Sequence, residues 1–348
     1  MTPTTAVRPA TTSRDTLSRT GRRGAGLVAG LAALALAVGL SIAVGSRWIG
    51  AGTVWQVLWH DDGSPSAVIV HQLRLPRTLL GLGVGAALGL AGTVMQALTR
   101  NPLAEPGLLG VNLGAATGVV LAIAFLGIGS ATGYVWFAFA GAALTSGAVF
   151  ALGGSGRAPT PERQVLAGVS LTAVLGAGVW AVLVTRREAF DRYRHWDVGS
   201  LADRETATVL QVMPFLVAGI LLAVTLGRQL NALSMGDDSA TALGARPGRI
   251  RALGMITITL LCGGATAACG PIWFLGLAVP YAARLFTGSD HRWILAYSLV
   301  LGPTLLLAAD VAGRVLVAPA ELPVGVVTAF LGAPLFIALC RRRRLSVL

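Results

Sequence analysis

Residues 74–118 read RLPRTLLGLGVGAALGLAGTVMQALTRNPLAEPGLLGVNLGAATG, the most informative pattern in the chain. Two apolar segments, each with glycines four residues apart, flank a short polar break. The glycines are Gly81, Gly85 and Gly89 in the first segment, and Gly110, Gly114 and Gly118 in the second. Small residues at this spacing share a helix face and let helix backbones approach closely inside a membrane. The pattern predicts two packed membrane helices, although generic helix packing would produce the same spacing.

The polar break contains two prolines, in the pairs Asn101-Pro102 and Glu105-Pro106. Proline lacks a backbone donor and restricts the residue before it, so it ends a helix. The first apolar segment is therefore expected to end before Pro102 and the second to begin after Pro106.

The composition is that of a membrane protein. Of 348 residues, 54% are hydrophobic and only 12% are charged, about half the usual share of a soluble domain, which is roughly 25%. The net charge of +12 comes from short arginine clusters between apolar runs, which is typical of cytoplasmic loops rather than of a nucleic-acid-binding face. The sequence predicts an all-α polytopic membrane protein with no nucleic-acid partner.

Ten spans are predicted, and their arginines predict the orientation. They begin near Gly24, Thr78, Gly107, Tyr134, Arg163, Thr206, Arg249, Ile272, Trp293 and Pro323. Residues 1–23 are expected to be a disordered cytoplasmic tail, and residues 24–348 the transmembrane domain. With the N-terminus inside, 18 of the 27 arginines fall on cytoplasmic segments. The positive-inside rule then places both termini in the cytoplasm and the chain in the cytoplasmic membrane.

The chain offers no candidate for catalysis or metal binding. It contains no lysine, whereas a P-loop needs a lysine on the nucleotide phosphates, so ATP-driven work would need ATP and Mg²⁺ on a partner chain. The three cysteines lack metal-ligand spacing and the four histidines are scattered, and no nucleophile–base pair is evident. We expect a non-enzymatic chain without a cofactor of its own.

The motifs RLPRT and MQALTRNPLAEPGLLG, and further blocks up to the C-terminus, resemble the permease subunits of ABC importers for iron–siderophores, haem and cobalamin. The resemblance implies the fold of the cobalamin-importer permeases (type II importers). It also implies two ATPase subunits, a second permease copy or a paralogous permease, and an extracytoplasmic solute-binding protein as partners. Ferric siderophore is the expected cargo, with haem or cobalamin as alternatives.

An ion-coupled secondary carrier is the alternative from another class. Such carriers place ionisable groups near the bilayer midplane. Here Glu105, Asp310 and Glu321 are expected near the ends of spans, which argues against that class.

The resemblance also implies where the binding protein docks. In this family the arginines of the R-x-x-R motif, here Arg74 and Arg77, and the arginine after an A-D-x-x-x-R block, here Arg314, receive acidic residues of the binding protein. Arginine's planar fork suits carboxylates. Anchoring to lipid headgroups is the alternative for the first two. Asp310 lies four residues before Arg314 and is expected to pair with it.

Residues 230–245 match the family's ATPase-coupling element and are expected to form two short helices joined by a glycine; an ordinary loop helix is the alternative. The coupling residues are Leu230, Leu233, Met235, Gly236, Asp237, Asp238, Leu243 and Gly244. The two aspartates lie at the start of the second helix, where negative charge is favourable, and Gly244 is expected to end it. Ser170 and Thr172 in the fifth span are the candidates for a translocation path lined by small, weakly polar residues.

Overall fold

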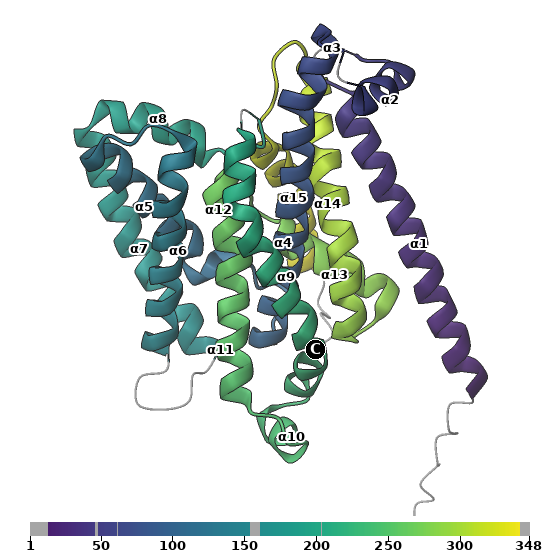
Figure 1. Cartoon of the computed structure of the whole chain (residues 1–348). Helices are drawn as coiled ribbons and strands as arrows, with labels where there is room; N and C mark the ends of the chain where they lie inside the picture. The colour runs from purple at the N-terminus through teal and green to yellow at the C-terminus, as the bar shows by residue number, and fades with distance from the viewer. Residues whose placement is uncertain (1–12, 46–47, 61, 154–160, 203, 342–348) are drawn as a thin grey trace, which may run out of the picture.

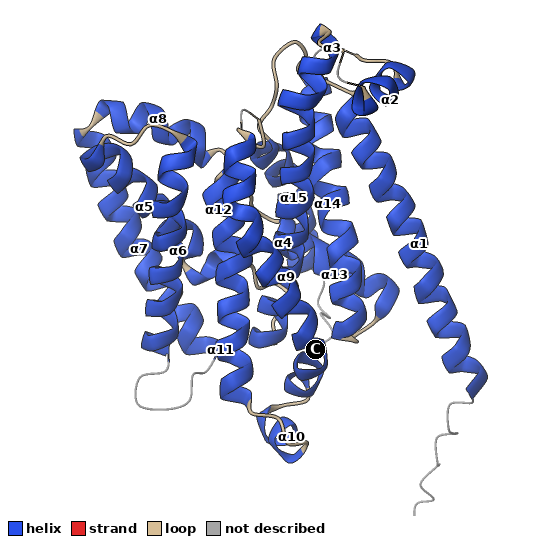
Figure 2. Ribbon diagram, in the orientation of Figure 1, coloured by secondary structure: helices blue, strands red, loops and turns tan. Residues whose placement is uncertain are grey.

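The computed structural model describes residues 13–45, 48–60, 62–153, 161–202 and 204–341. In these ranges the chain consists of helices and loops and contains no strand, so the predicted all-α class is confirmed (Figures 1 and 2). In chain order the elements are α1 (Ser13–Ala43), α2 (Ala51–Trp59), α3 (Pro65–Val68), η1 (Ile69–Arg74), α4 (Leu75–Thr99), η2 (Pro106–Leu109), α5 (Val111–Leu126), α6 (Ala131–Gly153), α7 (Pro161–Thr185), α8 (Arg187–Asp197), α9 (Thr206–Ser234), α10 (Asp237–Ala242), α11 (Pro247–Ile258), η3 (Thr259–Gly263), α12 (Gly264–Cys269), α13 (Leu275–Thr287), α14 (His291–Leu316) and α15 (Val324–Arg341).

Eight helical segments in the described part of the chain are long and apolar enough to cross a membrane. They are α1, the continuous α3–η1–α4, α6, α7, α9, the continuous α11–η3–α12, α14 and α15. The remaining two predicted spans correspond to α5 and α13, which have only 16 and 13 residues. At 1.5 Å per residue these two helices are about 24 and 20 Å long, too short for a hydrocarbon core of roughly 30 Å.

The first span begins at Gly21, close to the predicted Gly24, but the helix that contains it begins earlier. Helix α1 starts at Ser13, so the second half of the expected tail, residues 13–23, is helical. Residues 1–12 lie outside the described residues. In Figure 1 the start of α1 lies toward the end of the bundle that carries α10, whereas α2, α3 and α8 lie at the opposite end. We call these the inner and outer ends, after the orientation that the arginines predict.

Helix α4 is the central helix of the bundle. In the most apolar 18 residues of the span that contains α4, 83% of the residues are buried. The corresponding share in α7 is 11%. It packs most extensively on α14, and Gly81, Gly85 and Gly89 lie in this contact. A Cβ on Gly85 would lie 2.5 Å from Cα of Pro303, so only glycine permits the observed approach of the two backbones. The sequence predicted this close packing but not which helix would be the partner.

The second set of glycines divides into two roles. Gly114 and Gly118 lie against the backbone of α6, at Gly141 and Phe137, where a Cβ would clash. Gly110 instead precedes the helix: its φ is +76°, and it forms the N-cap of α5. Because few other residues adopt this conformation without strain, Gly110 allows the chain to turn from η2 into α5.

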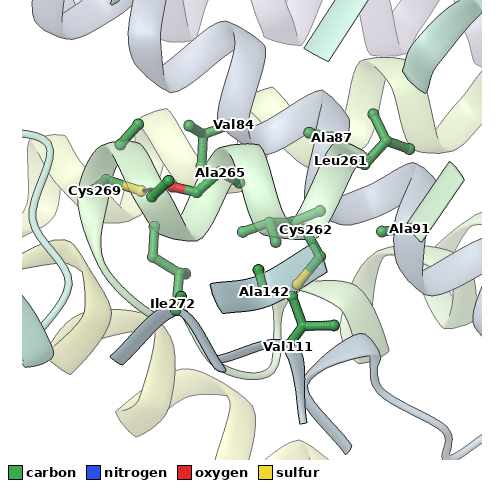
Figure 3. Packing of buried hydrophobic residues seen from close by; sticks show 14 of the residues in the cluster. Val84, Ala87, Ala91, Val111, Ala142, Leu261, Cys262, Ala265, Cys269 and Ile272 are labelled. Carbon is green, nitrogen blue, oxygen red and sulfur yellow. Dashed lines mark hydrogen bonds between the residues drawn. The ribbon is translucent and has the colours of Figure 1, made fainter. Parts of the chain in front are cut away.

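The main hydrophobic core lies where α4, α5, α6, η3 and α12 meet (Figure 3). Val84 of α4, Val111 of α5 and Ala142 of α6 pack there with small side chains of α12. Cys262 and Cys269 are buried in this core as free thiols, and Cys340 is free and exposed. Cys262 and Cys269 therefore serve as small apolar side chains, as predicted, whereas Cys340 is not packed in this core.

Candidate functional site

The inner end presents a short loop helix between α9 and α11. Residues 230–234 belong to the last turn of the 29-residue α9, so the first of the two predicted short helices is part of a longer one. Only the second, α10, is a separate short helix. Gly236, with φ +108°, forms its N-cap, and Gly244, with φ +80°, lies two residues after its end. The predicted positions of the two glycines are confirmed, and the connection is one long helix, a glycine turn and one short helix.

The predicted coupling residues divide into an exposed and a buried group. Leu230 and Leu233 are fully buried within the chain. Met235 and Leu243, in contrast, are 65% and 66% exposed at the tip of the inner end. Asp238 is also exposed. Two large exposed apolar side chains on one short loop are suited to contact another protein, whereas the buried leucines hold the loop in place.

Asp237 links three parts of the chain. Its carboxylate forms ion pairs with Arg100, the residue after α4, and with Arg251 of α11, whose Nη2 lies 2.9 Å from each carboxylate oxygen. Arg100 has a left-handed backbone, with φ +48°, and its Nε donates to the carbonyl of Leu233 at 3.0 Å. We call Arg100, Asp237 and Arg251 the inner cluster. Burial opposes ionisation of Asp237, but the hydrogen bonds and charges of Arg251 and then of Arg100 prevail and lower its pKa below 3.8.

The outer end carries a second set of charges, which we call the outer cluster: Arg74, Arg77, Asp310, Arg314 and Glu321. Nη2 of Arg77 lies 2.8 Å from Asp310, and Nη1 lies 2.6 Å from Glu321. Asp310 also pairs with Arg314, so the expected pair at i and i+4 is confirmed. Asp310 and Arg314 are almost completely buried, and the pairs join α4 to α14.

Arg74 and Arg314 also bind the end of α1. Nη1 of Arg74 donates to the carbonyls of Ile42 and Ala43 at 2.7 and 2.8 Å. Nη1 of Arg314 donates to the carbonyls of Ser41 and Val44 at 2.8 and 3.1 Å. The last carbonyls of a helix have no partner within the helix, and cations near its C-terminus also favour its dipole. Both arginines are thus buried inside the chain, where the sequence predicted positive groups facing outward.

A cavity of about 1080 Å³ opens at the outer end, bounded by α8, the loop that follows it, η1 and the 321–323 segment. The three arginines of the outer cluster line it, together with Arg192, Arg204 and Tyr134. Nη1 of Arg204 donates to the Tyr134 hydroxyl at 2.9 Å. The charged lining of this cavity thus consists of five arginines and three acidic residues, Asp191, Glu205 and Glu321, apart from His195, and the sequence had indicated three of the five arginines as docking residues.

The two candidate path residues of α7 face different surroundings. Ser170 is exposed and lines a groove of about 550 Å³ that also includes Arg163 and Leu152. Thr172 is half-buried, and its hydroxyl lies against Gly110 at the start of α5. The structure thus places only Ser170 on the open face of α7.

Glu105 lies in the connection between α4 and η2, and this connection packs back against the bundle. Its Oε1 accepts a hydrogen bond from the backbone N–H of Phe274, at 2.6 Å, just before α13 begins. The next residue, Pro106, lies against Gly276, and Gly276 lies against Gly92 of α4. Since Gly92 is seven residues before the end of α4, this contact lies about 10 Å inside the inner end of that helix. Asp310 and Glu321 lie at the outer end, as expected.

The sequence did not indicate Arg100 and Arg251 as members of the inner cluster, or Glu105 as the acceptor for the Phe274 N–H. Arg100 and Glu105 flank the Asn101-Pro102 break, and a charged residue on each side of a break between apolar segments was the available signal. Arg251 had no local signal. In the described ranges no group of three or more His, Cys, Asp or Glu side chains is placed to hold a metal ion.

Comparisons with known proteins identify the class of the chain and then its family. The structure matches a metal-chelate type ABC transporter in an inward-facing conformation, with a TM-score of 0.80, 28% identity, and coverage of 92% of this chain and 99% of that one. The fold is thus that of an ABC transporter permease, a multi-pass protein of the cytoplasmic membrane that transports and is not an enzyme. The chain belongs to the FecCD transport family, whose model matches residues 33–342.

Two curated relatives cover most of the chain. The ferric enterobactin transport system permease protein FepD of Escherichia coli (strain K12) is 47% identical over 89% of this chain and 93% of its own length. The iron(3+)-hydroxamate import system permease protein FhuB of Bacillus subtilis (strain 168) is 39% identical over 91% of this chain and 83% of its own length. Both are iron-chelate permeases by name.

Proposed function

We propose that this chain is the permease subunit through which an ABC importer moves a ferric siderophore into the cell. The observation that carries the proposal is the 47% identity, over nearly the whole chain, to the ferric enterobactin permease. Haem and cobalamin are the alternative cargoes within the family. Both termini are proposed to be cytoplasmic, because the arginine bias favours that side.

In this proposal two ATPase subunits bind the ATP and Mg²⁺ and receive the loop helix α10. Met235 and Leu243 would insert into a groove on the ATPase, since both are apolar and exposed at the tip of the inner end. Gly236 and Gly244 would set the shape of the contact, and Leu230 and Leu233 would support it from behind. Asp238 is exposed and free to face the partner.

The translocation path is proposed to run between two permeases, either two copies of this chain or this chain and a paralogue. The open face of α7 supports this, because only 11% of its most apolar window is buried. Ser170 would line the path. Thr172 would act indirectly, by positioning α7 against the start of α5.

The binding protein is proposed to dock over the outer cavity through acidic side chains. Arg77 is the best placed of the three predicted arginines, since its side chain keeps 12% of its surface exposed while pairing with Asp310 and Glu321. Arg74 and Arg314 are buried, so they would contribute positive charge beneath the docking surface while also binding the end of α1. Charge reversal of Arg77 should therefore weaken docking more at low salt than at high salt. Unchanged affinity for the binding protein at low salt in Arg77→Glu would contradict the docking proposal.

The cargo is tested in proteoliposomes that contain the permease with its ATPase, with the binding protein added outside. ATP-dependent uptake of radiolabelled ferric siderophore is expected, with little uptake of haem or cobalamin. A preference for haem or cobalamin would overturn the choice of cargo. Uptake that needs an ion gradient and no ATPase would overturn the ABC assignment in favour of a secondary carrier.

A further inference from the structure

Residues 100–110 connect the inner cluster to the interior of the bundle. At one end Arg100 bonds to Asp237, the first residue of α10, and to the carbonyl of Leu233 in α9. Five residues later Glu105 bonds to the N–H of Phe274, two residues before Gly276, which lies against Gly92 about 10 Å inside the inner end of α4. The same short segment thus contacts both the loop helix proposed to meet the ATPase and the first residues of α13.

The segment is braced along its length. The N–H of Leu103 donates to Oδ1 of Asn101 at 2.9 Å, and the N–H of Ala104 donates to the Asn101 carbonyl at 3.1 Å. Pro102 and Pro106 fix two of its φ angles. Because local hydrogen bonds and two prolines restrict the backbone, the two ends of the segment are expected to move together.

Beyond Glu105 the contacts lead to α15 and α7. Phe274 has a left-handed backbone, with φ +67°, and its ring lies 6.3 Å from that of Phe336 in α15. Gly332 of α15 lies directly against the Phe274 side chain. At the far end of the segment Gly110 faces Thr172 of α7. Much of the surface of both helices is exposed. In their most apolar 18 residues, only 33% of the residues of α15 and 11% of those of α7 are buried.

We propose that residues 100–110 form a strut that transmits displacement of α10 to α13, α15 and α7, with Asp237 and Glu105 as the positioning residues at its two contacts. The inference rests on the proposed function, because it assigns the route by which the ATPase subunits would act on the path. It gives Asp237 a role within the chain, distinct from direct contact with the ATPase, and gives Glu105 a role that requires no change in its charge.

The contact at Glu105 needs an acceptor and not a charge, which provides a matched pair of variants. Glu105→Gln keeps an oxygen that can accept from the Phe274 N–H, whereas Glu105→Met has a similar length and no such acceptor. In proteoliposomes of the complete complex, Glu105→Met should lower siderophore uptake per ATP hydrolysed by about ten-fold, a usual size for coupling between two sites. Glu105→Gln should remain near wild type, and ATP hydrolysis should be retained in both.

Double variants test whether the two contacts belong to one route. Arg100→Met removes the first contact, and Arg251→Met removes the other partner of Asp237 while leaving the strut attached. If the strut exists, Arg100→Met combined with Glu105→Met should transport no worse than the poorer single variant. In Arg251→Met combined with Glu105→Met, the fold-reduction in uptake per ATP should instead equal the product of the two single fold-reductions, as it does for independent sites.

Spin labels provide a readout that loss of stability alone would not move. Labels on Val169 of α7 and Phe330 of α15, both exposed, are placed in a Cys340→Ser background because Cys340 is itself exposed. ATP should change the distance between the labels in wild type and in Glu105→Gln, and should not change it in Glu105→Met.

Three results would overturn the strut: wild-type coupling in Glu105→Met, a parallel loss of uptake and ATP hydrolysis, or multiplicative losses in the Arg100 double variant. The failure of the proposed function looks different, since the wild-type complex itself would then show no ATP-dependent uptake of ferric siderophore.

Discussion

The outer and inner clusters bind opposite ends of the same central helix, and they differ in burial. At the outer end Arg77 joins α4 to Asp310, a carboxylate with no exposed surface. At the inner end Arg100 follows α4 and joins Asp237, whose side chain is 43% exposed. Each cluster pairs arginines with aspartate, so the chemistry is similar and the solvent exposure is not.

The difference implies different mechanical properties. Removing one partner of a buried ion pair leaves a charge in a medium of low dielectric constant, which costs about 3–5 kcal/mol, whereas an exposed pair contributes only about 0–1 kcal/mol. The outer cluster is therefore expected to persist through any movement of the protein. In the inner cluster Arg251 is buried but Asp237 and Arg100 are partly exposed, so the pair of Arg100 with Asp237 can rearrange at lower cost, as a contact that transmits motion must.

The largest effect is expected from Asp310→Leu. This change leaves Arg77 and Arg314 buried without their shared carboxylate, and should destabilise the folded protein by about 3–5 kcal/mol. Thermal unfolding of the purified protein in detergent measures the change, with Glu188→Gln, which removes an exposed pair on α8, as the control. A melting temperature equal to that of the control would show that the outer cluster is no more costly to break than a surface pair.

A more local effect is expected at the end of α1. Arg74→Met releases two carbonyls of α1, and Arg314→Met releases the Ser41 carbonyl of α1 together with that of Val44, the residue after the helix. Hydrogen bonds to charged groups contribute about 1.5–3 kcal/mol, so amide exchange in the last turn of α1 should accelerate about 10- to 100-fold.

Arg77→Met is the control for this measurement, because no hydrogen bond joins Arg77 to α1 among the described contacts. Equal acceleration in all three variants would mean that the end of α1 responds to the stability of the whole cluster and is not held by Arg74 and Arg314 individually.

A smaller effect on stability is expected from Asp237→Asn. The side chains of Asp237 and Arg100 are 43% and 31% exposed, but that of Arg251 is only 5% exposed, so the loss of the two pairs should cost about 1–3 kcal/mol, less than at Asp310. The cost should shrink in 1 M salt, where the screening length falls to about 3 Å, while that of Asp310→Leu should persist. Chemical unfolding at low and high salt makes the comparison. A salt-independent loss at Asp237 would remove the distinction between the clusters.

The smallest effect concerns pH. The pKa of Asp237 is lowered in the folded protein from 3.8, so its carboxylate contributes stability above that value, and the contribution is lost as pH falls through the lower folded pKa. The difference in stability between wild type and Asp237→Asn should therefore be constant from about pH 7 to pH 5 and should decline only below about pH 4. A decline between pH 7 and pH 5 would show that the Arg251 and Arg100 contacts do not lower this pKa.

Several features could be predicted because they depend on residues close together in the sequence. The prolines at positions 102 and 106 end one helix and delay the next. The glycine spacing of residues 81–89 requires a close partner. Gly236 and Gly244 delimit a short helix, since each adopts a backbone angle that other residues avoid.

Other features could not be predicted, because they depend on contacts between distant residues. Arg314 is a strong candidate for an outward-facing docking group until α1, some 270 positions away in the chain, is seen to end against it. Glu105 stands between prolines after the end of α4, and only the approach of the 270–276 segment to α4 shows that this connection packs back against the bundle.

Local features of the sequence predicted an all-helical membrane protein with a loop helix bounded by two glycines at one end and Arg74, Arg77 and Arg314 at the other, and its motifs resemble those of a permease family. Hydrophobic length, helix-breaking residues and arginine distribution are local properties that the membrane selects for directly. The tertiary structure alone decided which charges pair, which helix is central and how the inner loop connects to the interior. Those outcomes depend on which carbonyls and carboxylates are brought within hydrogen-bonding distance by packing, and buried polar groups must find such partners wherever in the chain they lie.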